Sequence, residues 1–427
     1  MRGHGKWRAL LVVALVTAQG CWLQAGFDGR RSGFNGGETG ITSATVARLA
    51  PVWTATLGGT PGEPVVFDGS LYVRGGGQVT ALAAATGAVR WTSTGVGGGG
   101  SPLLAGNRLY VPAGGGHCEI DTLSLASGAV VGSLPIGGPE LNGVGGSGFS
   151  FCSVGDALWA GSRVATVWTY AGGAPAPRAC GTNLFVAASG NGISGLDVDD
   201  PSVSFDTNTV TQTCTVPPPL FPLPGPLSSD GASILSTDDT AVTGYPLTCS
   251  GFSCSPTVHW TTATPMVPTV VPLASGGDAA VVQRDGHVAV VDAHTGAVRW
   301  TGSLGAAGAA SLPPAVTDTT IFALADDGML SAFPVGGCGA STCPATWTAS
   351  LPAKATGRAS IVGDVLYVGS SDGTLSAFAA GGCGAATCTP RFTATVPGAV
   401  SGSPVADGGT LYVGSTTGTI TAYRVPA

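Results

Sequence analysis

Short apolar runs of five or six residues recur along the chain and are separated by turns that contain glycine. The run LYVGS at 411–415 shows no alternation, which is typical of a strand buried on both faces. The turn TTG and the alternating run TITAY at 419–423 follow it, as in a tight hairpin. A further run, VRWT at 298–301, marks a fourth strand in another copy of the unit. The pattern predicts four antiparallel strands in about 45 residues.

This unit is repeated along most of the chain. Residues 69–93 match 278–302 down to the shared letters TGAVRWT, and 364–378 match 409–423. Second strands are expected to begin near residues 71, 109, 158, 234, 280, 321, 366 and 411. Such a small sheet cannot cover its own faces, so radial packing of sheet against sheet is favoured, as in a β-propeller. A solenoid is the rival, but no helical period occurs in the sequence.

The two ends of the chain are expected to complete one sheet. The last repeat stops after its third strand, and APVWTATLG at 50–58 is typical of a fourth strand with no partners before it. We predict an all-β propeller of four-stranded antiparallel blades, in which this N-terminal strand completes the last blade. Eight blades are favoured if the step from 158 to 234 is one blade with an insertion at about 170–230; seven blades are the alternative.

Composition narrows the class of protein. The 427 residues include 70 Gly and 30 Pro, and only 10% are charged, which argues against a helical bundle. The apolar fraction of 44% is enough for a core. The formal net charge of −7 argues against a nucleic-acid partner, which requires a basic surface. Five scattered histidines do not suggest a histidine-built metal site.

The N-terminus indicates export. MRGHGKWR supplies positive charge and ALLVVALVTA a short apolar segment, as in a signal peptide over residues 1–20. The letters AQGC then end at Cys21, which resembles a bacterial lipobox and predicts lipidation of Cys21; cleavage after Ala18 is the alternative. The domain prediction continues with a lead-in segment, 21–49, and a single propeller domain, 50–427.

The cysteines favour an oxidising compartment. Removing Cys21 from the 11 cysteines leaves an even number, which suits disulfides. Two near-identical loops, GGCGASTC and GGCGAATC, and a third, LTCSGFSC, stand where a unit turns from its third to its fourth strand. Loops on different blades lie too far apart to share a zinc ion, so each predicts a local disulfide. The predicted pairs are Cys338–Cys343, Cys383–Cys388 and Cys249–Cys254, with Cys118–Cys152 and Cys180–Cys214 paired by proximity.

The repeats resemble those of the pyrroloquinoline-quinone-like (PQQ-like) β-propeller family. The similarity lies in LYVRGGGQVTALAAATGAVRW and VAVVDAHTGAVRW, and in the lead-in DGRRSGFNGGETGITSATVARLAPVW at 28–53. In that family the fourth-strand tryptophans dock between adjacent blades, where a large aromatic surface is buried. The resemblance implies this inter-blade packing role for Trp53, Trp91, Trp260, Trp300, Trp347 and Phe392.

The resemblance leaves activity open, because a fold does not fix a function. Quinone-dependent dehydrogenases of the family hold PQQ over the central channel with calcium, an acidic base and often a disulfide between adjacent cysteines. This sequence has no Cys-Cys pair and no Cys-x-x-Cys-His motif. We therefore predict no cofactor and no catalytic, cofactor-binding or metal-binding residues. A calcium site at 197–206 and a PQQ-dependent dehydrogenase with PQQ and calcium are the alternatives.

The favoured function is a non-catalytic binding or scaffold protein of the bacterial cell envelope or exterior. Its predicted partner is a protein or a surface polymer, with no nucleic acid and with membrane contact only through a lipid on Cys21. The chain is expected to be a monomer, either as a cell-surface or envelope lipoprotein or as a secreted protein. A surface carbohydrate-binding or adhesin module is a further alternative.

Overall fold

The computed structural model describes most of the chain outside the N-terminus and the stretch 136–270. The described residues are 22–23, 25–28, 30–96, 101–105, 108–112, 119–135, 271–273, 277–283, 285–305 and 309–426, together with strands within 158–262. Their one helix is a single 3-10 turn, η1 (Val46–Arg48). Within these residues no helix is long and apolar enough to span a membrane.

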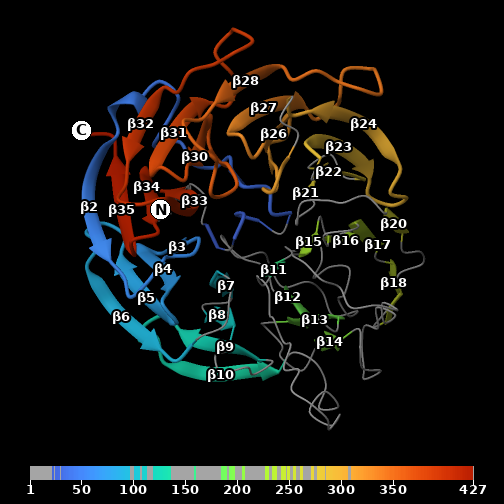
Figure 1. The fold of residues 1–427 in the computed structure, drawn as a ribbon. Helices are drawn as coiled ribbons and strands as arrows, with labels where there is room; N and C mark the ends of the chain where they lie inside the picture. Colours follow the sequence, from blue (N-terminus) through green and yellow to red (C-terminus); the bar gives the residue numbers. More distant parts are fainter. Residues whose placement is uncertain are drawn as a thin grey trace, which may run out of the picture.

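Four-stranded antiparallel sheets are arranged radially around a common centre (Figure 1). The first strand of each sheet lies towards the centre and the fourth towards the outside. The second strand β34 (Thr410–Ser415) is buried along its whole length, whereas the outer strand β6 (Val89–Thr94) alternates between exposed and half-buried positions. Inner strands are buried along most of their length because a sheet packs against each of their faces. The all-β, four-stranded antiparallel prediction is confirmed.

In the first half of the chain, the strands follow the predicted four-strand unit. The sheets are β3 (Val65–Phe67), β4 (Ser70–Gly75), β5 (Gln78–Ala83) and β6; β7 (Leu103–Ala105), β8 (Arg108–Pro112), β9 (Glu119–Ser124) and β10 (Val130–Pro135); β11 (Leu158–Trp159), β12 (Leu184–Ser189), β13 (Gly192–Asp197) and β14 (Ser204–Asp206); and β15 (Leu227–Ser229), β16 (Ser233–Thr237), β17 (Val242–Pro246) and β20 (Trp260–Thr262). A two-stranded hairpin, β18 (Thr248–Ser250) and β19 (Ser253–Ser255), lies between β17 and β20 in the sequence.

The second half of the chain continues the same order. The sheets are β21 (Val271–Pro272), β22 (Asp278–Val282), β23 (His287–Asp292) and β24 (Val298–Ser303); β25 (Ala315–Val316), β26 (Thr320–Leu324), β27 (Met329–Pro334) and β28 (Trp347–Ser350); β29 (Ser360–Val362), β30 (Val365–Gly369), β31 (Thr374–Ala379) and β32 (Phe392–Thr395); and β33 (Val400–Asp407), β34, β35 (Thr419–Arg424) and β2 (Ala50–Thr56). A short strand, β1 (Phe34–Asn35), pairs in parallel with β29.

The predicted second strand near residue 158 is wrong. Leu158–Trp159 is β11, which is the first strand of its sheet and pairs with β12 in second position. The long step in the repeat therefore precedes residue 184, and the expected insertion at 170–230 contains β12, β13 and β14. The sequence LFVAASGNGISGLD at 184–197 has the apolar run, tight turn and further strand of the repeat, so the signal was present.

The N-terminal strand β2 lies on the outside of the last sheet. It pairs antiparallel with β35, from Ala50 opposite Arg424 to Thr56 opposite Thr419. The hydroxyls of Thr54 and Thr421 are 3.1 Å apart across this pair. The two ends of the described chain therefore share one sheet.

The core lies between neighbouring sheets. One cluster joins Trp300 of β24 to Phe333 of β27, and the next joins Trp347 of β28 to Phe378 of β31. A third cluster includes Trp22 and Ile41, which precede β2 in the chain, together with residues of the sheets containing β3, β29 and β33. The segment before β2 thus belongs to the core.

Candidate functional site

Residues 22–41 run through the centre of the sheet arrangement, seen as the deep-blue trace in Figure 1. We call this stretch the axial segment; residues 24 and 29 within it lie outside the described residues. Trp22 and Ile41 are fully buried. The axial segment therefore runs along the centre of the arrangement with these two side chains packed into the core.

Backbone hydrogen bonds join the axial segment to the first strands of several sheets. Its carbonyl groups accept from N–H groups of four different sheets. These bonds are Val66 N to Trp22 O (2.8 Å), Leu104 N to Leu23 O (2.8 Å), Val316 N to Ser32 O (2.8 Å) and Ile361 N to Gly33 O (2.7 Å). A first strand has a free edge facing the axis, and an unpaired buried N–H group is costly. The axial segment satisfies these edges.

Charged side chains reinforce the start of the axial segment. The Glu63 carboxylate accepts from the Trp22 indole N–H at 2.9 Å and from the Gly26 N–H at 2.7 Å, both through Oε1. The Arg358 guanidinium donates to the carbonyl of Arg31. Arg31 and Arg358 are 1% and 9% exposed. These groups are engaged in holding the segment.

A second set of carboxylates holds the far end of the axial segment and the residues after it. Glu38 accepts from the Gly40 N–H at 2.5 Å and from the Gly409 N–H at 3.1 Å. Asp364 accepts from the N–H and hydroxyl of Ser43 at 2.8 and 2.5 Å. Burial, and then the charge of Glu38, raise the pKa of Asp407 to about 6. Burial, Glu38 and Asp364 also raise the pKa of the Tyr367 hydroxyl.

Quinone-dependent dehydrogenases of the resembled family hold PQQ and calcium at the centre of the propeller, so the residues at the centre of this protein are compared with such a site. The Glu63 carboxylate bonds the buried Trp22 and Gly26, and the Glu38 carboxylate bonds Gly40 of the axial segment. Within the part of the chain described here, no three His, Cys, Asp or Glu side chains are grouped to hold a metal ion. The carboxylates of Glu63 and Glu38 are engaged by groups of the chain, so these described residues do not form a free polar set that would hold a quinone or a calcium ion.

The outer-strand aromatic residues lie between sheets. The indole N–H groups of Trp53, Trp91 and Trp260 donate to carbonyls in the next sheet: Ala84 O at 3.2 Å, Leu125 O at 2.8 Å and Ala293 O at 2.8 Å. In each case the indole covers the glycine of a Thr-Gly or Ser-Gly turn, such as Gly128 beneath Trp91. Gly128 has a φ of +69°, and a Cβ there would overlap the ring.

Two tryptophans contact the cysteine loops instead. Trp300 covers Gly337 and Trp347 covers Gly382, each with Cδ1 2.8 Å from where a glycine Cβ would stand. The Trp300 indole N–H is buried and has no hydrogen-bond partner within the described chain. Phe392 of β32 packs edge-on against Tyr423, with ring centroids 6.2 Å apart. All six aromatic residues thus contact a neighbouring sheet or its turn.

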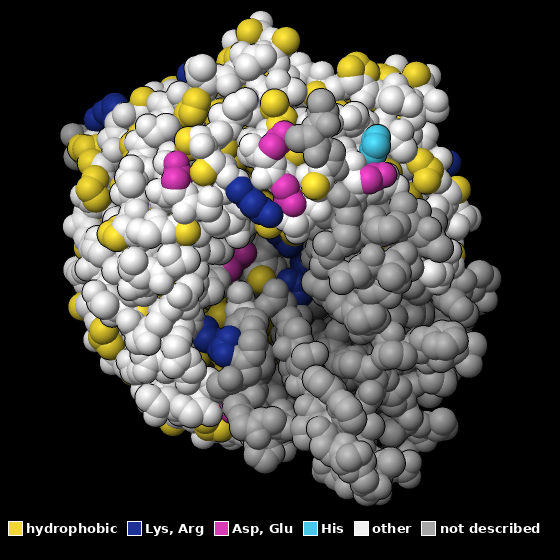
Figure 2. All heavy atoms as spheres, in the orientation of Figure 1, with side chains coloured by type: hydrophobic (Ala, Val, Ile, Leu, Met, Phe, Trp, Pro, Cys, Tyr) yellow, Lys and Arg dark blue, Asp and Glu magenta, His cyan; other side chains and the backbone are white. Residues whose placement is uncertain are grey.

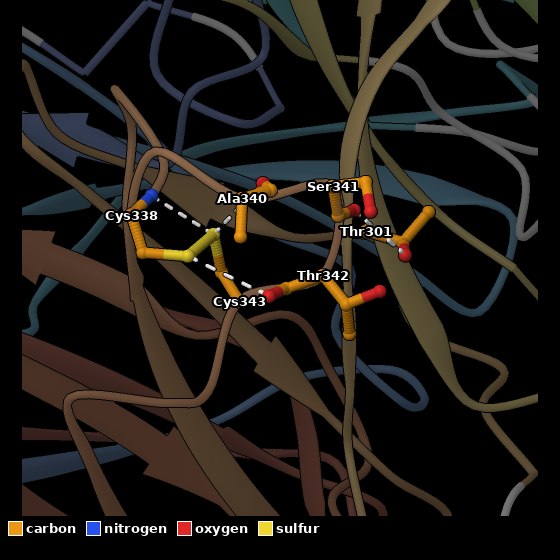
Figure 3. The surroundings of a disulfide bond; sticks show 6 residues. All are labelled: Thr301, Cys338, Ala340, Ser341, Thr342 and Cys343. Atoms are coloured by element: carbon orange, nitrogen blue, oxygen red, sulfur yellow. Dashed lines mark hydrogen bonds between the residues drawn. A yellow bond between two sulfur atoms is a disulfide. The ribbon is translucent and has the colours of Figure 1, made fainter.

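The cysteine loops reach across to the outer strand of the preceding sheet. The structure contains the Cys338–Cys343 and Cys383–Cys388 disulfides, each with a Cα–Cα distance of 5.6 Å. Thr301 of β24 donates to Ser341 O at 2.9 Å and accepts from Cys343 N at 2.7 Å (Figure 3). Thr348 of β28 makes the same pair of bonds with Ala386 and Cys388 in the second loop, both at 2.8 Å. We call these two loops the clasps.

The other predicted disulfides involve cysteines that the structure describes only in part or not at all. Cys249 and Cys254 are direct partners in the β18–β19 hairpin, whose side chains are not described. Cys21, Cys118, Cys152, Cys180 and Cys214 lie outside the described residues. Those pairs and the lipidation of Cys21 stay predictions.

The outer edges of the molecule differ around its circumference. Clasps cover the edges of β24 and β28, whereas among the described residues no loop pairs with the outer edge of β2 or β6. Val52, Val89 and Val130 on the outer strands are 48%, 58% and 50% exposed. On the face in Figure 2, most charged side chains lie around a hollow near the middle, and much of the remaining described surface is uncharged.

Four functional residues were not predicted from the sequence: Trp22, Glu63, Arg31 and Arg358. The adjacent arginines of GRRSG, directly after Asp28 in a chain with only 10% charged residues, are the signal that could have found Arg31. No local pattern marks Glu63 or Arg358.

Radial four-stranded sheets with outer-strand tryptophans define a PQQ-repeat β-propeller. Residues 42–203, 255–336 and 335–425 match the family described as outer membrane protein assembly factor BamB. The chain belongs to this PQQ-repeat propeller family. No curated protein matches the chain.

Solved structures share the fold at low sequence identity. Quinohemoprotein alcohol dehydrogenase from Comamonas testosteroni is 15% identical with a TM-score of 0.62, over 95% of this chain and 80% of that one. BamB from Moraxella catarrhalis is 14% identical with a TM-score of 0.56, over 88% and 97%. A europium-containing methanol dehydrogenase is 11% identical with a TM-score of 0.57, over 95% and 98%. At such identities these similarities describe the fold alone.

Proposed function

We propose that this protein is a non-catalytic scaffold of the bacterial cell envelope that binds another protein. The family description, outer membrane protein assembly factor, supports this class of role. The ring has eight blades in this proposal, which begin with β3, β7, β11, β15, β21, β25, β29 and β33, and β2 closes it. A rigid ring of this kind presents loops and edges without moving parts.

The observation that carries the proposal is the bonding of the axial segment to the sheets around it. A quinoprotein of this family needs space and free polar groups on the axis. Here the axial segment pairs with first strands, and Glu63 bonds both the Trp22 indole and the Gly26 N–H. A segment built into the core serves rigidity, which suits a scaffold better than an enzyme.

The outer edges of β2 and β6 offer a surface for the partner. An exposed strand edge is a template for an added strand, and natural proteins usually cover such edges. The clasps cover the outer edges of β24 and β28 with an extended segment that bonds the backbone of Thr301 or Thr348. A bound partner would cover the edges of β2 and β6 in the same way. The exposed Val52 and Val89 add apolar contact beside the open edges.

Export belongs to the same proposal. The two disulfides are consistent with an oxidising compartment. A signal peptide over 1–20 and a lipid on Cys21 would place the protein on a membrane surface, with the propeller outside the bilayer. Mass spectrometry of the protein from its native membrane would show whether Cys21 carries acyl chains.

Site-specific crosslinking tests the scaffold role. A photoreactive amino acid is placed at Val89 of the open edge and, as a matched control, at exposed Gly381 of a clasp, where a Cβ has no atom within 4 Å. We expect one discrete protein adduct in the native envelope from Val89 and none from Gly381. Equal or absent adducts at both positions would count against the edge as the binding surface.

Reconstitution tests the enzymatic alternative. The purified protein is mixed with PQQ and calcium and assayed for alcohol and aldose oxidation with an artificial electron acceptor. We expect no turnover above a protein-free control. Sustained turnover would overturn the non-catalytic proposal, whatever the crosslinking shows.

A further inference from the structure

A pocket of about 450 Å³ lies between the sheets of β25–β28 and β29–β32. Hydroxyl groups dominate its polar lining: Ser350, Thr374, Ser376, Thr393 and Thr395. Its volume is within the range of small-molecule sites. The pocket lies away from the axial segment and from the open edges of β2 and β6.

The pocket lies beside a short side chain at the start of a third strand. The first residue of the third strand is Gln78 in β5 and Met329 in β27. The Gln78 side chain touches Gly58, and Met329 Cγ lies 4.0 Å from where a Cβ of Gly305 would be, so both reach the connection after the preceding sheet. In β31 this position is Thr374, which is too short to fill the same space.

One residue of the pocket wall has an unpartnered polar group. Ser376 is fully buried, and its hydroxyl has no hydrogen-bond partner among the described residues. A buried hydroxyl without a partner costs free energy, and native proteins rarely keep one without a reason. Thr393 lies directly opposite Ser376 on β32 and is exposed, so the same wall is reachable from solvent.

The lining defines the chemistry of the ligand. Among the described residues no charged side chain lines the pocket, and the serine and threonine hydroxyls can each donate and accept. Leu351, Pro352 and Pro390 supply an apolar wall. A ligand with many hydroxyls, an apolar ring face and no charge matches this combination. We propose that the pocket binds a neutral saccharide unit of a glycan.

The test is titration of the whole protein with neutral disaccharides, followed by calorimetry and ligand-observed NMR. Maltose, lactose and chitobiose are the probes, and glucuronate and glucosamine are charged controls. We expect saturable millimolar or tighter binding of at least one neutral sugar and no binding of the charged ones. Absence of saturable binding by every neutral probe up to about 20 mM, or equal binding of the charged sugars, would overturn the proposal.

Two variants assign the binding to this pocket. Thr374→Met places in β31 the residue that β27 has at the same position, Met329. The longer side chain should fill the pocket and abolish binding, while the unfolding midpoint stays unchanged. Ser376→Ala should weaken binding about fivefold to tenfold without loss of stability, because no internal bond is lost. Ser331→Ala, at the same position of β27, is the matched control and should bind like the original protein. Unchanged affinity in Thr374→Met would sink the assignment.

Discussion

Neighbouring sheets are joined in two different ways in this molecule. At the junction of Trp91 and Gly128, a short turn receives the indole, and the indole N–H bonds the carbonyl of Leu125. At the junction of Trp300 and Gly337, a clasp replaces the turn, and the indole N–H has no partner among the described residues. The glycine contact is common to both, but the polar anchor differs.

The difference shows that an inter-sheet junction needs a polar anchor but not a particular one. At the short turn a single side-chain bond supplies it. At the clasp two backbone bonds to Thr301 supply it. Cys343 belongs to the same core cluster as Trp300, which is 5% exposed. The clasp also covers the strand edge, which the short turn leaves open.

The largest expected effect is the loss of an indole. Trp300→Ala should destabilise the protein by about 3–5 kcal/mol, because it removes a buried indole and leaves a cavity in the core. Trp91→Ala should cost less, since Trp91 is only half-buried. Denaturant unfolding of both variants measures the difference. An equal loss would mean that the clasp does not improve burial of the indole.

Removal of a clasp disulfide should have the next largest effect. The double variant Cys338→Ala/Cys343→Ala should lose about 2 kcal/mol, the loop-closure value for so short a loop. Hydrogen exchange at the Thr301 N–H, which donates to Ser341, should become faster, while exchange in β6 stays unchanged. If exchange rose equally in β6, the clasp would not be a local anchor.

Much of this architecture could be predicted from the sequence. Short sequence motifs of a few residues predict the four-strand unit, the outer-strand aromatics and the Cys338–Cys343 loop. Each motif recurs along the chain, so one copy supports the assignment of the others. The last repeat lacks a fourth strand, and the N-terminal part of the chain has a strand without partners. These two observations together assigned β2 to the last sheet. Local periodicity and repetition thus account for the fold.

The centre of the molecule could not be predicted in the same way. The axial segment has no period, and its partners are backbone groups such as Val66 N and Ile361 N, which leave no mark in side-chain patterns. Pairing of Cys343 N with Thr301 O is invisible for the same reason. The pocket lies beside Thr374, and the contrast with the longer Met329 at the same position becomes visible only when the sheets are compared in space.

Removal of the indole N–H alone isolates the polar anchor. Trp91→Phe should cost about 1 kcal/mol more than Trp300→Phe, because it leaves Leu125 O without its donor while Trp300 has no bond to lose. Both variants keep an aromatic ring over the glycine, and the deeper burial of Trp300 makes its packing loss the larger of the two. A greater cost for Trp91→Phe would therefore come from the lost bond and not from packing. Equal unfolding free energies would show that the indole bond is not what anchors the short-turn junction.

The smallest expected effect is a dependence on pH that is independent of the clasps. The folded-state pKa of Asp407 is raised to about 6 by burial and by Glu38, so the folded protein binds this proton more tightly than the unfolded chain. The protonated Asp407 carboxyl therefore stabilises the fold below about pH 4, and this contribution is lost as the pH rises through 6. The free energy of unfolding should fall by about 1 kcal/mol or less, because the group is partly solvated.

Asp407→Asn should remove this slope from denaturant unfolding curves recorded between pH 4 and 7. The same slope is expected with the disulfides oxidised or reduced, because Asp407 lies at the end of β33, in a sheet that carries neither clasp. A slope that changed on reduction would couple the two regions. It would then follow that the clasps hold the axial segment as well as the outer edge, and the distinction between the two kinds of junction would extend to the centre of the ring.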